Sequence, residues 1–378
     1  MNKGGDKNSP GACAVHPDNG QRRLNVVKNE RVRIVDIAEE LGLSTATVSN
    51  VLHGKTKKIS DETVKRVQEL LEKREYMPGM ADILLAQNNS RIIGVVVNDH
   101  EKYEGHVLED GFVSATINTL SREIDKAGYF MMVKPTTQWD EIVRFASMWN
   151  MEGLVIIGFC EQDYKKLREC MRIPFVAYEG YFQEAQRICN LTIDNYGGGY
   201  QAGQYLKSMG HEKVLCISDN DESMDSERIK GFMDAMGALP VGFMQTSFLK
   251  EERMRFYEEK IEEILEYTAI FALSDYYAIE IMNYLKKHGV RVPEDISIMG
   301  FDDSPLCHYS SPALTTMGQG IALRAKKAIE ILLNLRNGSE KRSMLEFPVK
   351  VIERESVKNI KSKQEVIKQE WRMNNDKK

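Results

Sequence analysis

Short apolar runs that alternate with amphipathic helices constrain the fold of this chain more than any other feature. Runs such as IIGVVV (92–97) and LVIIG (154–158) carry no polar residue at alternate positions, so both faces of each strand must be buried. A helical stretch between them carries apolar residues in helical step: Val113, Ile117, Leu120 and Ile124. This alternation predicts parallel sheets covered by helices on both faces.

The predicted strands fall into two sets along the chain. The first set comprises 92–97, 130–133, 154–158 and 175–178, and the second comprises 214–218, 269–273 and 296–301. Each set spans about 100–120 residues, which suits one doubly wound lobe. Sheets of this kind bind ligands at the carboxyl ends of their strands, so we expect a ligand between the two lobes.

Residues 32–76 have a different pattern, that of three short helices. Gly42 supplies the break after the first helix, while Ser44 and Ser60 stand as N-caps before the second and third. Each helix has an apolar face, made by Ile34, Ile37, Ala38 and Leu41, by Val48, Val51 and Leu52, and by Val64, Val67, Leu70 and Leu71. A short turn between the first two helices indicates a helix-turn-helix unit.

Charge is distributed unevenly along the chain. The net charge of −5 argues against non-specific binding of nucleic acid by the whole protein. Residues 31–79, however, carry nine Lys and Arg against eight Asp and Glu. Five of the basic residues are close in sequence: Lys55, Lys57, Lys58, Lys65 and Arg66. The helical segment therefore has a modest basic patch on an acidic body.

Several classes of protein are excluded by what the sequence lacks. No apolar run approaches the ~20 residues that cross a bilayer, and residues 1–20 lack the apolar stretch of a secretory signal. We therefore expect a cytoplasmic protein without a membrane partner. The six cysteines are scattered and form no CxxC pair, which predicts neither a metal site nor a disulfide framework. No motif indicates a cofactor.

The helical segment resembles a known family of DNA-binding proteins. RIVDIAEELGLSTATVSNVLHG (33–54) and SDETVKRVQELLEKREYMP (60–78) are similar to the headpiece of the lactose-repressor (LacI/GalR) family. Further segments resemble landmarks of the family's periplasmic-binding-protein-like core: 193–214, 226–232, 272–280, 296–306 and 312–320. The resemblance covers nearly all of the chain from residue 31 to about residue 356.

This resemblance implies an α+β multidomain protein, with an all-α helix-turn-helix headpiece on an α/β two-lobed core. The expected divisions are a disordered tail (1–30), the headpiece (31–78), a hinge helix and linker (79–90), the effector-binding and dimerisation domain (91–356), and a charged tail (357–378). The family implies a homodimer on a pseudo-palindromic operator in double-stranded DNA. A small effector, expected to be a sugar, would bind in the cleft and change the affinity for DNA, so that the protein regulates transcription as a repressor.

The second helix of a helix-turn-helix enters the major groove, and its first residues reach the base edges. We expect base contacts from Thr45, Ala46, Ser49 and Asn50, and phosphate contacts from Ser44, Thr47, His53 and Lys57. An exposed asparagine that touches no base is the alternative for Asn50. Leu85 matches the family's leucine wedge in the minor groove, although ordinary helix packing would also use it. Asp82 departs from the family pattern and would face the phosphates.

Four residues match ligand-facing positions of the family: Glu179, Arg228, Phe248 and Asp275. Arginine suits bidentate hydrogen bonding to hydroxyls or carboxylates, and an aromatic ring can stack on a sugar. An ion pair between the lobes or an aromatic residue of the core is the alternative at each position. The loop 98–111 is longer than in most family members, and Asp99 and Tyr103 on it could touch the ligand.

Two other functions compete with that of a regulator. A solute-binding protein of a sugar transporter would share the two lobes, but it would be exported and would not carry residues 31–79. An enzyme would need a catalytic motif, and neither a nucleophile elbow nor a phosphate loop is present. The pair Asp302–Asp303 reads as a turn after a strand. The sequence therefore favours a regulator over an enzyme.

Overall fold

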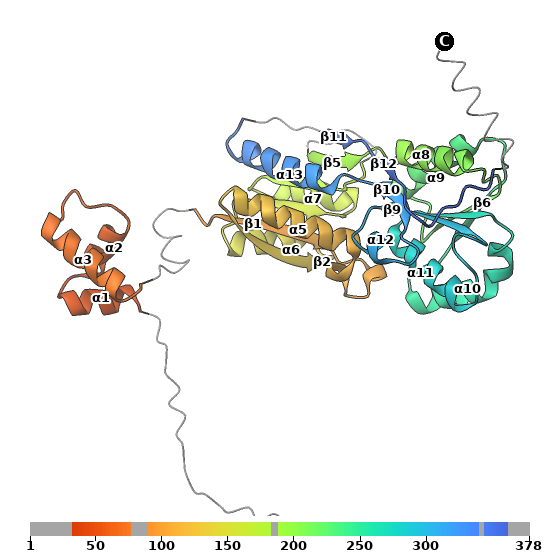
Figure 1. Ribbon diagram of the computed structural model, residues 1–378. Coiled ribbons are helices and arrows are strands. Elements are labelled where there is room, and N and C mark those ends of the chain that lie inside the picture. Colours follow the sequence, from red (N-terminus) through yellow and green to blue (C-terminus); the bar gives the residue numbers. More distant parts are fainter. Residues whose placement is uncertain (1–31, 77–88, 183–187, 340–343, 362–378) are drawn as a thin grey trace, which may run out of the picture. The chain divides into compact units, whose positions relative to one another are not determined.

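The computed structural model describes residues 32–76, 89–182, 188–339 and 344–361 (Figure 1). The chain divides into two compact units, Met1–Ala86 and Gln87–Lys378. Most of the predicted hinge, 79–90, lies outside the described residues, as do the predicted N-terminal tail and nearly all of the C-terminal tail. No helix in the described ranges is long and apolar enough to span a membrane.

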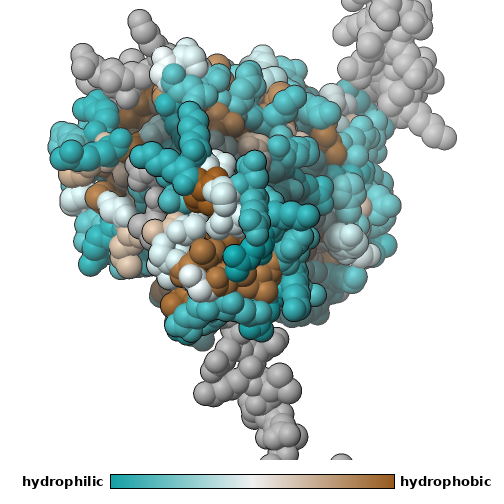
Figure 2. Space-filling model, turned by 90° about the vertical axis from the view of Figure 1, so that its left-hand side faces the viewer, coloured by the Kyte–Doolittle hydropathy of each residue, from teal (hydrophilic) through white to brown (hydrophobic). Residues whose placement is uncertain are grey.

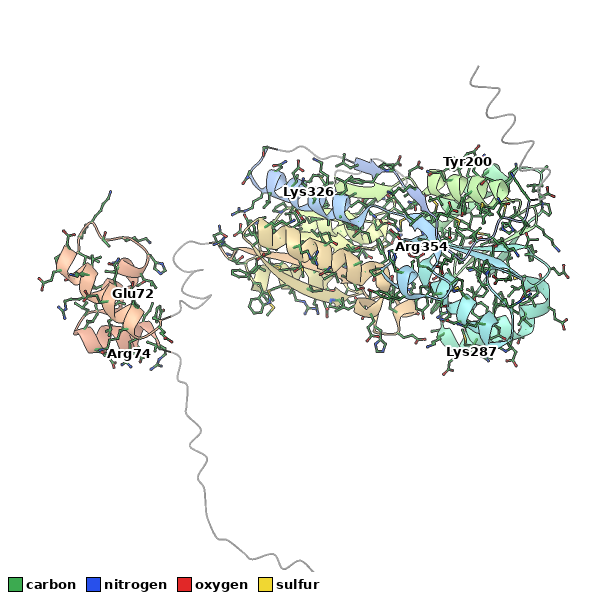
Figure 3. All side chains as sticks on the ribbon, viewed as in Figure 1. Glu72, Arg74, Tyr200, Lys287, Lys326 and Arg354 are labelled. Carbon is green, nitrogen blue, oxygen red and sulfur yellow. The ribbon has the colours of Figure 1, made fainter. Side chains whose placement is uncertain are left out.

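Three helices form the headpiece: α1 (Ile34–Leu41), α2 (Thr45–Leu52) and α3 (Asp61–Lys73). Gly42 ends α1 in the left-handed conformation at φ 66°, as its place in the sequence predicts. The hydroxyls of Ser44 and Ser60 cap α2 and α3 by accepting from the backbone N–H groups three residues later. One apolar cluster joins the helices, with buried members Ile37, Ala38, Val48, Val51, Val67 and Leu70. Arg74, labelled in Figure 3, ties α3 to α1 by an ion pair of 2.6 Å with Glu40.

A six-stranded parallel sheet forms the first lobe, in the order β11-β5-β4-β3-β1-β2. Its strands are β1 (Ile92–Asn98), β2 (Phe130–Thr136), β3 (Gly153–Ile157), β4 (Phe175–Tyr178), β5 (Cys189–Ile193) and β11 (Met344–Phe347). Four of these coincide with the predicted strands of the first set. The sequence pattern did not indicate β5 or β11.

Helices cover both faces of this sheet, as the continuous apolar runs predict. Its long helices are α5 (Gly111–Lys126), α6 (Trp139–Met148), α7 (Glu161–Cys170) and α13 (Ile321–Arg336). Ile93, Val95 and Val97 of β1 belong to the cluster that contains the apolar residues of α5 and α13. The alternate residues Ile92 and Val96 belong to the cluster of α6 and α7. The side chains of β1 therefore belong to two apolar clusters, because successive side chains of a strand point to opposite faces of the sheet.

The second lobe repeats this architecture with the sheet β12-β10-β9-β8-β6-β7. Its strands are β6 (Val214–Ser218), β7 (Val241–Gln245), β8 (Ala269–Ala272), β9 (Ser297–Asp302), β10 (Thr315–Gly318) and β12 (Lys350–Ile352), of which β12 is antiparallel to β10. The apolar residues of α8 (Asn195–Ser208) and α9 (Ser223–Met236) join the cluster of Val214 and Cys216. Those of α10 (Lys250–Ile264) and α11 (Asp275–Lys287) join the cluster of Leu215 and Ile217. The short helix α12 (Leu306–Tyr309) follows β9.

The two lobes are interleaved in sequence. The chain leaves the first sheet after β5, returns with α13 and β11, and ends in the second sheet with β12. Three segments therefore connect the lobes, near residues 194, 319 and 348. The lobes are also joined by packing, because one apolar cluster contains buried residues of both sheets, such as Ile193 of β5 and Phe301 of β9.

Two glycines let α8 and α9 approach each other closely. A side chain at Gly199 would overlap the backbone carbonyl of Arg228, and one at Gly231 would overlap that of Tyr196. The close approach fixes the position of Arg228 on α9. Hydrophilic residues cover most of the face shown in Figure 2, and hydrophobic residues gather in a patch in its lower middle.

Candidate functional site

The face of α2 that the apolar core leaves free is polar and exposed. Val48 and Val51 are buried against α1 and α3, whereas Thr45, Ala46 and Asn50 are exposed and Ser49 is half-buried. This division arises from the helical repeat, which places the polar residues opposite the buried valines. The predicted base-reading residues therefore lie together on one accessible surface.

The predicted phosphate contacts lie at the two ends of α2. Ser44 and Thr47 are joined at the N-terminus, where the Ser44 hydroxyl accepts from the backbone N–H of Thr47 at 3.1 Å. His53 is the C-terminal cap of α2, and Lys57 is exposed in the turn before α3. Leu85, the predicted wedge, lies outside the described residues together with Asp82.

A cavity of about 1020 Å³ lies between the two lobes at the carboxyl ends of their strands. From the first lobe it is lined by residues at the ends of β1, β3 and β4, among them Asn98, Gly158, Glu179 and Tyr181. From the second lobe the lining includes Ser218, Asp219, Leu273, Asp302 and Gln319. The cavity lies where the strand pattern predicts that a ligand would bind.

Arg228 lines this cleft and is fixed by four contacts. Its Nε donates to Oδ1 of Asn195 at 2.9 Å, and its Nη1 donates to the backbone oxygen of Leu273 at 2.9 Å. The guanidinium lies 3.9 Å from the centroid of the Phe301 ring, so its plane is packed on an aromatic face. An Asp225 carboxylate lies 3.5 Å from Nη1. Arg228 is therefore a preorganised donor at the cleft wall.

Glu179 also lines the cleft, but its carboxylate is already paired. It makes an ion pair with Arg324 of α13, which is completely buried. Arg324 also donates to Oε1 of Gln319 at 2.7 Å, and Gln319 donates to Oδ1 of Asp302 at 2.5 Å. The network therefore runs from the first lobe to the second through one of the connecting segments.

Asp302 is the acidic end of this network. Burial raises its pKa well above the ordinary value, and the nearby Asp275 carboxylate raises it further. Asp302 lines the cleft at the end of β9, with φ of 129°. The sequence pattern indicated only a turn at this position.

Asp275 and Phe248 do not line the cleft, contrary to expectation. Asp275 is the first residue of α11, and its carboxylate points behind the cavity wall, where it accepts hydrogen bonds from Ser304 N at 2.7 Å and Thr316 Oγ1 at 2.5 Å. Its helical neighbours Tyr276 and Tyr277 reach the cavity instead. Phe248 lies beside the cleft residue His100, with ring centroids 6.1 Å apart. Of the four predicted ligand contacts, the structure brings Glu179 and Arg228 together in the cavity.

Several lining residues were not predicted. Asn98, Asp219 and Asp302 stand at or just after the ends of strands, so the rule that ligands bind at carboxyl ends would have found them. Tyr103 lines the cleft, as suggested for its loop, whereas Asp99 does not. Lys102, in the same loop, carried no sequence signal.

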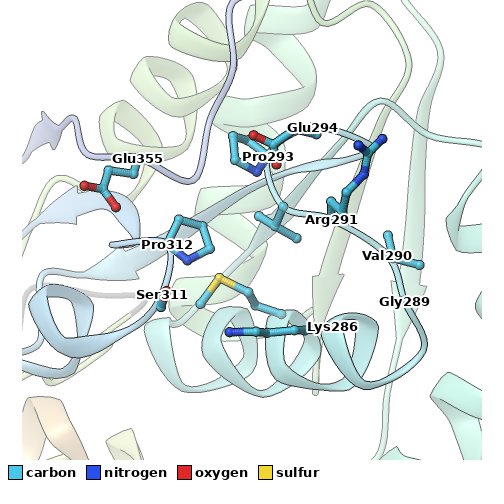
Figure 4. A pocket seen from close by; sticks show the side chains of 11 residues that line it. Lys286, Gly289, Val290, Arg291, Pro293, Glu294, Ser311, Pro312 and Glu355 are labelled. Atoms are coloured by element: carbon cyan, nitrogen blue, oxygen red, sulfur yellow. The ribbon is translucent and has the colours of Figure 1, made fainter.

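A second cavity, of about 650 Å³, lies on the second lobe at the amino ends of β9 and β10 (Figure 4). Lys286, Arg291, Pro293, Pro312 and Glu355 are among the residues around it. Amino ends of parallel strands are not where such sheets bind ligands, so the cleft between the lobes is the better candidate.

Comparison with known proteins agrees with this anatomy. Residues 33–79 match the model of bacterial regulatory proteins of the lacI family, and residues 204–357 match the periplasmic binding protein-like domain. The HTH-type transcriptional repressor PurR of Vibrio atlanticus (strain LGP32) is 27% identical over 342 residues, which are 86% of this chain and 99% of that protein. The repressor of the same name from Aliivibrio salmonicida is 28% identical over 340 residues, 86% and 98% of the two chains.

Solved structures share the fold. The lac repressor dimer bound to operator and the anti-inducer ONPF aligns with a TM-score of 0.72 at 21% identity, covering 87% of this chain and 100% of that one. A periplasmic binding protein/LacI transcriptional regulator from Alkaliphilus metalliredigens, complexed with D-xylulofuranose, aligns with a TM-score of 0.61 at 26% identity, covering 71% and 99%.

A helix-turn-helix headpiece joined to a two-lobed, binding-protein-like core defines a DNA-binding transcriptional regulator with an effector-binding domain. The chain belongs to the lacI family of bacterial regulatory proteins. The related proteins that match along this length are transcriptional repressors, which confirms the prediction of a regulator over an enzyme.

Proposed function

We propose that this protein represses transcription by binding a pseudo-palindromic operator as a homodimer, and that a sugar bound between its lobes changes its affinity for that operator. The observation that carries the proposal is the exposed polar face of α2, with Thr45, Ala46 and Asn50 over buried Val48 and Val51. A surface of this kind at the start of a recognition helix suits the major groove. A protein that binds chromosomal DNA in this way would act in the cytoplasm.

In this proposal, residues in the first turns of α2 contact the base edges directly. The Asn50 amide can make a bidentate pair with adenine N6 and N7, and the Thr45 and Ala46 methyl groups suit a thymine methyl. Ser49 adds a hydroxyl at the edge of this face. Ser44, Thr47, His53 and Lys57 flank the helix and would hold phosphates, which fixes the register of the protein on the duplex. Leu85 would act as a wedge in the minor groove.

A single headpiece should bind DNA weakly, and this favours a homodimer. Residues 31–79 carry only one more basic than acidic side chain, so a single copy gains little from phosphate neutralisation. Two copies related by a two-fold axis double the contacts and require an operator with matching symmetry. The lac repressor, whose fold this chain shares, binds its operator as a dimer, and this supports the same arrangement here.

The lining of the cleft suits a ligand rich in hydroxyl groups. Carboxylates of Asp219 and Asp225 can accept from hydroxyls, while the Arg228 guanidinium can donate to them. Tyr103, Phe112, Phe159 and Tyr181 add aromatic surface to the same lining. Proteins of the same fold have been solved with sugars bound, D-xylulofuranose and ribose among them, which supports a sugar as the ligand.

A thermal-shift screen of pentoses, hexoses and disaccharides, with nucleobases as the other ligand class, tests the effector. A ligand present at about 100 times its Kd stabilises the folded protein by roughly 2.7 kcal/mol, which is a readily measured change in Tm. Operator affinity is then measured with and without each compound that shifts Tm. A sugar that shifts Tm and also changes operator affinity is expected. Stabilisation by nucleobases alone would contradict the sugar.

A further inference from the structure

The loop between β1 and α5, residues 99–110, reaches from the first lobe to the second. We refer to these residues as the strap. The strap contains two short 3-10 turns, Glu101–Tyr103 and Val107–Glu109. Oε1 of Glu104 accepts a hydrogen bond from the backbone N–H of Lys250 at 3.4 Å, and the His100 ring meets the edge of Phe248. Both partners belong to the second lobe, so the strap bridges the mouth of the cleft.

Lys102 of the strap lines the cleft together with three carboxylates. Asp219 and Asp225 come from the second lobe and Asp110 caps α5 in the first. The pKa of Lys102 is raised by its interaction with Tyr103, and next, against the effect of burial, by Asp219, Asp225 and Asp110. In turn, Lys102, Tyr277 and Asn220 outweigh burial at Asp219 and lower the pKa of that carboxyl. The Lys102 ammonium therefore lies in the electrostatic field of these carboxylates. We refer to Asp219 and Asp225, which belong to the second lobe, as the acidic wall.

Both arginines that line the cleft are held by other groups. Arg228 is bound to Asn195 and to the Leu273 carbonyl. Arg253 is paired with Glu280, with 2.6 Å between Nε and Oε1. Within the described ranges, by contrast, the Lys102 ammonium makes neither a hydrogen bond nor an ion pair below 4 Å, and Tyr103 presents its ring centroid at 5.2 Å. The Lys102 ammonium therefore lacks the fixed polar partners that hold the two arginines.

The acidic wall keeps its shape through partners in its own lobe. Asp219 accepts from the Tyr277 hydroxyl at 2.7 Å and from Asn220 Nδ2 at 2.7 Å. Asp225 accepts from Ser218 at 3.1 Å. These carboxylates stay in position whether or not Lys102 is beside them, so they can accept from a ligand in its place.

We propose that the Lys102 ammonium is a tethered occupant of the cleft, which stands where the donor groups of the effector bind and which the effector must displace. This rests on the proposed function, because the site is the same cleft. Its consequence is a ligand class: a small molecule that presents hydroxyl or ammonium donors to Asp219 and Asp225. An anion such as a sugar phosphate would be repelled by the wall that Lys102 leaves behind.

The experiment removes the Lys102 ammonium by mutation and then supplies a free alkylammonium ion from solution. In Lys102→Ala the carboxylates lose an attracting cation, so Tm should fall relative to wild type at low salt. Propylammonium chloride should then restore Tm in a saturable way, beyond the effect of sodium chloride at equal ionic strength. Wild type should show no such difference between the two salts. Lys287→Ala, an exposed lysine on α11 of the second lobe, is the matched control and should behave as wild type.

Lys102→Ala/Asp219→Asn identifies the partner, because it should lose the response to propylammonium. The proposal is overturned if Lys102→Ala shows no loss of Tm, or if propylammonium and sodium chloride act alike on it. None of these measurements uses DNA or the effector. Operator binding by the same protein is measured separately, so failure of the tethered occupant is distinguishable from failure of the proposed function.

Discussion

The Nε atom of Arg228 donates a hydrogen bond to Oδ1 of Asn195 at 2.9 Å, and this contact ties α9 to the first residue of α8. Asn195 stands just after β5, where the chain crosses from the first lobe to the second. Arg228 is thus held by a residue of the crossover while its guanidinium lines the cleft. A ligand that engages Arg228 therefore contacts a side chain that is fixed to the crossover between the lobes.

Arg228→Ala should abolish the response to effector and leave operator affinity without effector unchanged. The cleft loses its fixed donor, whereas the headpiece is a separate compact unit. Truncation also leaves Asn195 and the Leu273 carbonyl without a partner, at a cost of about 1–3 kcal/mol in stability. Operator titrations with and without effector measure the response, and Lys326→Ala on the exposed side of α13 (Figure 3) is the control. A normal response in Arg228→Ala would show that the effector binds elsewhere.

Asn50→Ala should cost about 1–3 kcal/mol of binding free energy at the operator and relax the preference at one base pair per half-site. The reason is loss of the bidentate amide contact with a base edge. Binding of a panel of single-base operator variants measures the effect. Asn283→Ala, an exposed asparagine on α11, provides the control. An unchanged preference at every position would remove Asn50 from base reading.

Lys57→Ala should weaken binding to all duplexes alike. A phosphate contact carries no sequence information, so its loss lowers the slope of log affinity against log salt concentration by about one. Titrations of specific and unrelated duplexes over a range of salt concentrations measure that slope. A loss confined to the operator would mean that Lys57 contacts a base.

Glu179→Ala should destabilise the core domain, because it leaves the buried Arg324 guanidinium without its counter-charge. Loss of one member of a buried pair costs about 3–5 kcal/mol. The matched control is Glu330→Ala, which removes a partly exposed pair with Lys327 on α13 and should cost less than about 1 kcal/mol. Urea denaturation measures both variants. Equal costs would contradict a structural role for the Glu179–Arg324 pair.

Asp275 should make stability depend on pH. Burial raises the pKa of Asp275 to about 6, although hydrogen bonds from Cys307, Thr316 and Ser304 partly oppose the increase. The folded protein therefore holds a proton that the unfolded chain has released. The contribution of this group is favourable below pH ~4 and is lost as pH rises through ~6.

Urea denaturation between pH 4 and 7 tests this dependence, with Asp275→Asn as the variant. The free energy of unfolding of wild type relative to Asp275→Asn should fall as pH rises through that range. Asp140→Asn, at an exposed position on α6, should leave the pH dependence unchanged. A difference between wild type and Asp275→Asn that is constant with pH would contradict the assignment.

Much of the fold could be predicted because its signals are local. The N-caps Ser44 and Ser60, the break at Gly42 and the continuous apolar strands each depend on a few neighbouring residues. The strands β5 and β11 lack such a signal. In β5, Asn190 and Thr192 interrupt the apolar run, and β11 has exposed Met344 and Glu346 at a sheet edge. Their pairing is decided by contacts between distant parts of the chain, and so is the return of α13 to the first lobe.

The residues that line the cleft could be predicted only in part, because the sequence does not show which way each side chain points. The carboxyl ends of the strands could be located from sequence, and Arg228 and Glu179 do line the cavity. Asp275 could not be placed, because its neighbours Tyr276 and Tyr277 follow it directly and only packing decides which of the three faces the cavity. Lys102 reaches the cleft through a loop whose path depends on contacts with the second lobe.

Selection of bound sequences from a random pool of duplex DNA tests the central claim most directly. Wild-type protein should enrich an inverted repeat of two half-sites, and Asn50→Ala should lose one base preference symmetrically in both halves. Enrichment of a single asymmetric half-site, or of no sequence at all, would contradict a dimeric, sequence-specific regulator that reads DNA through α2.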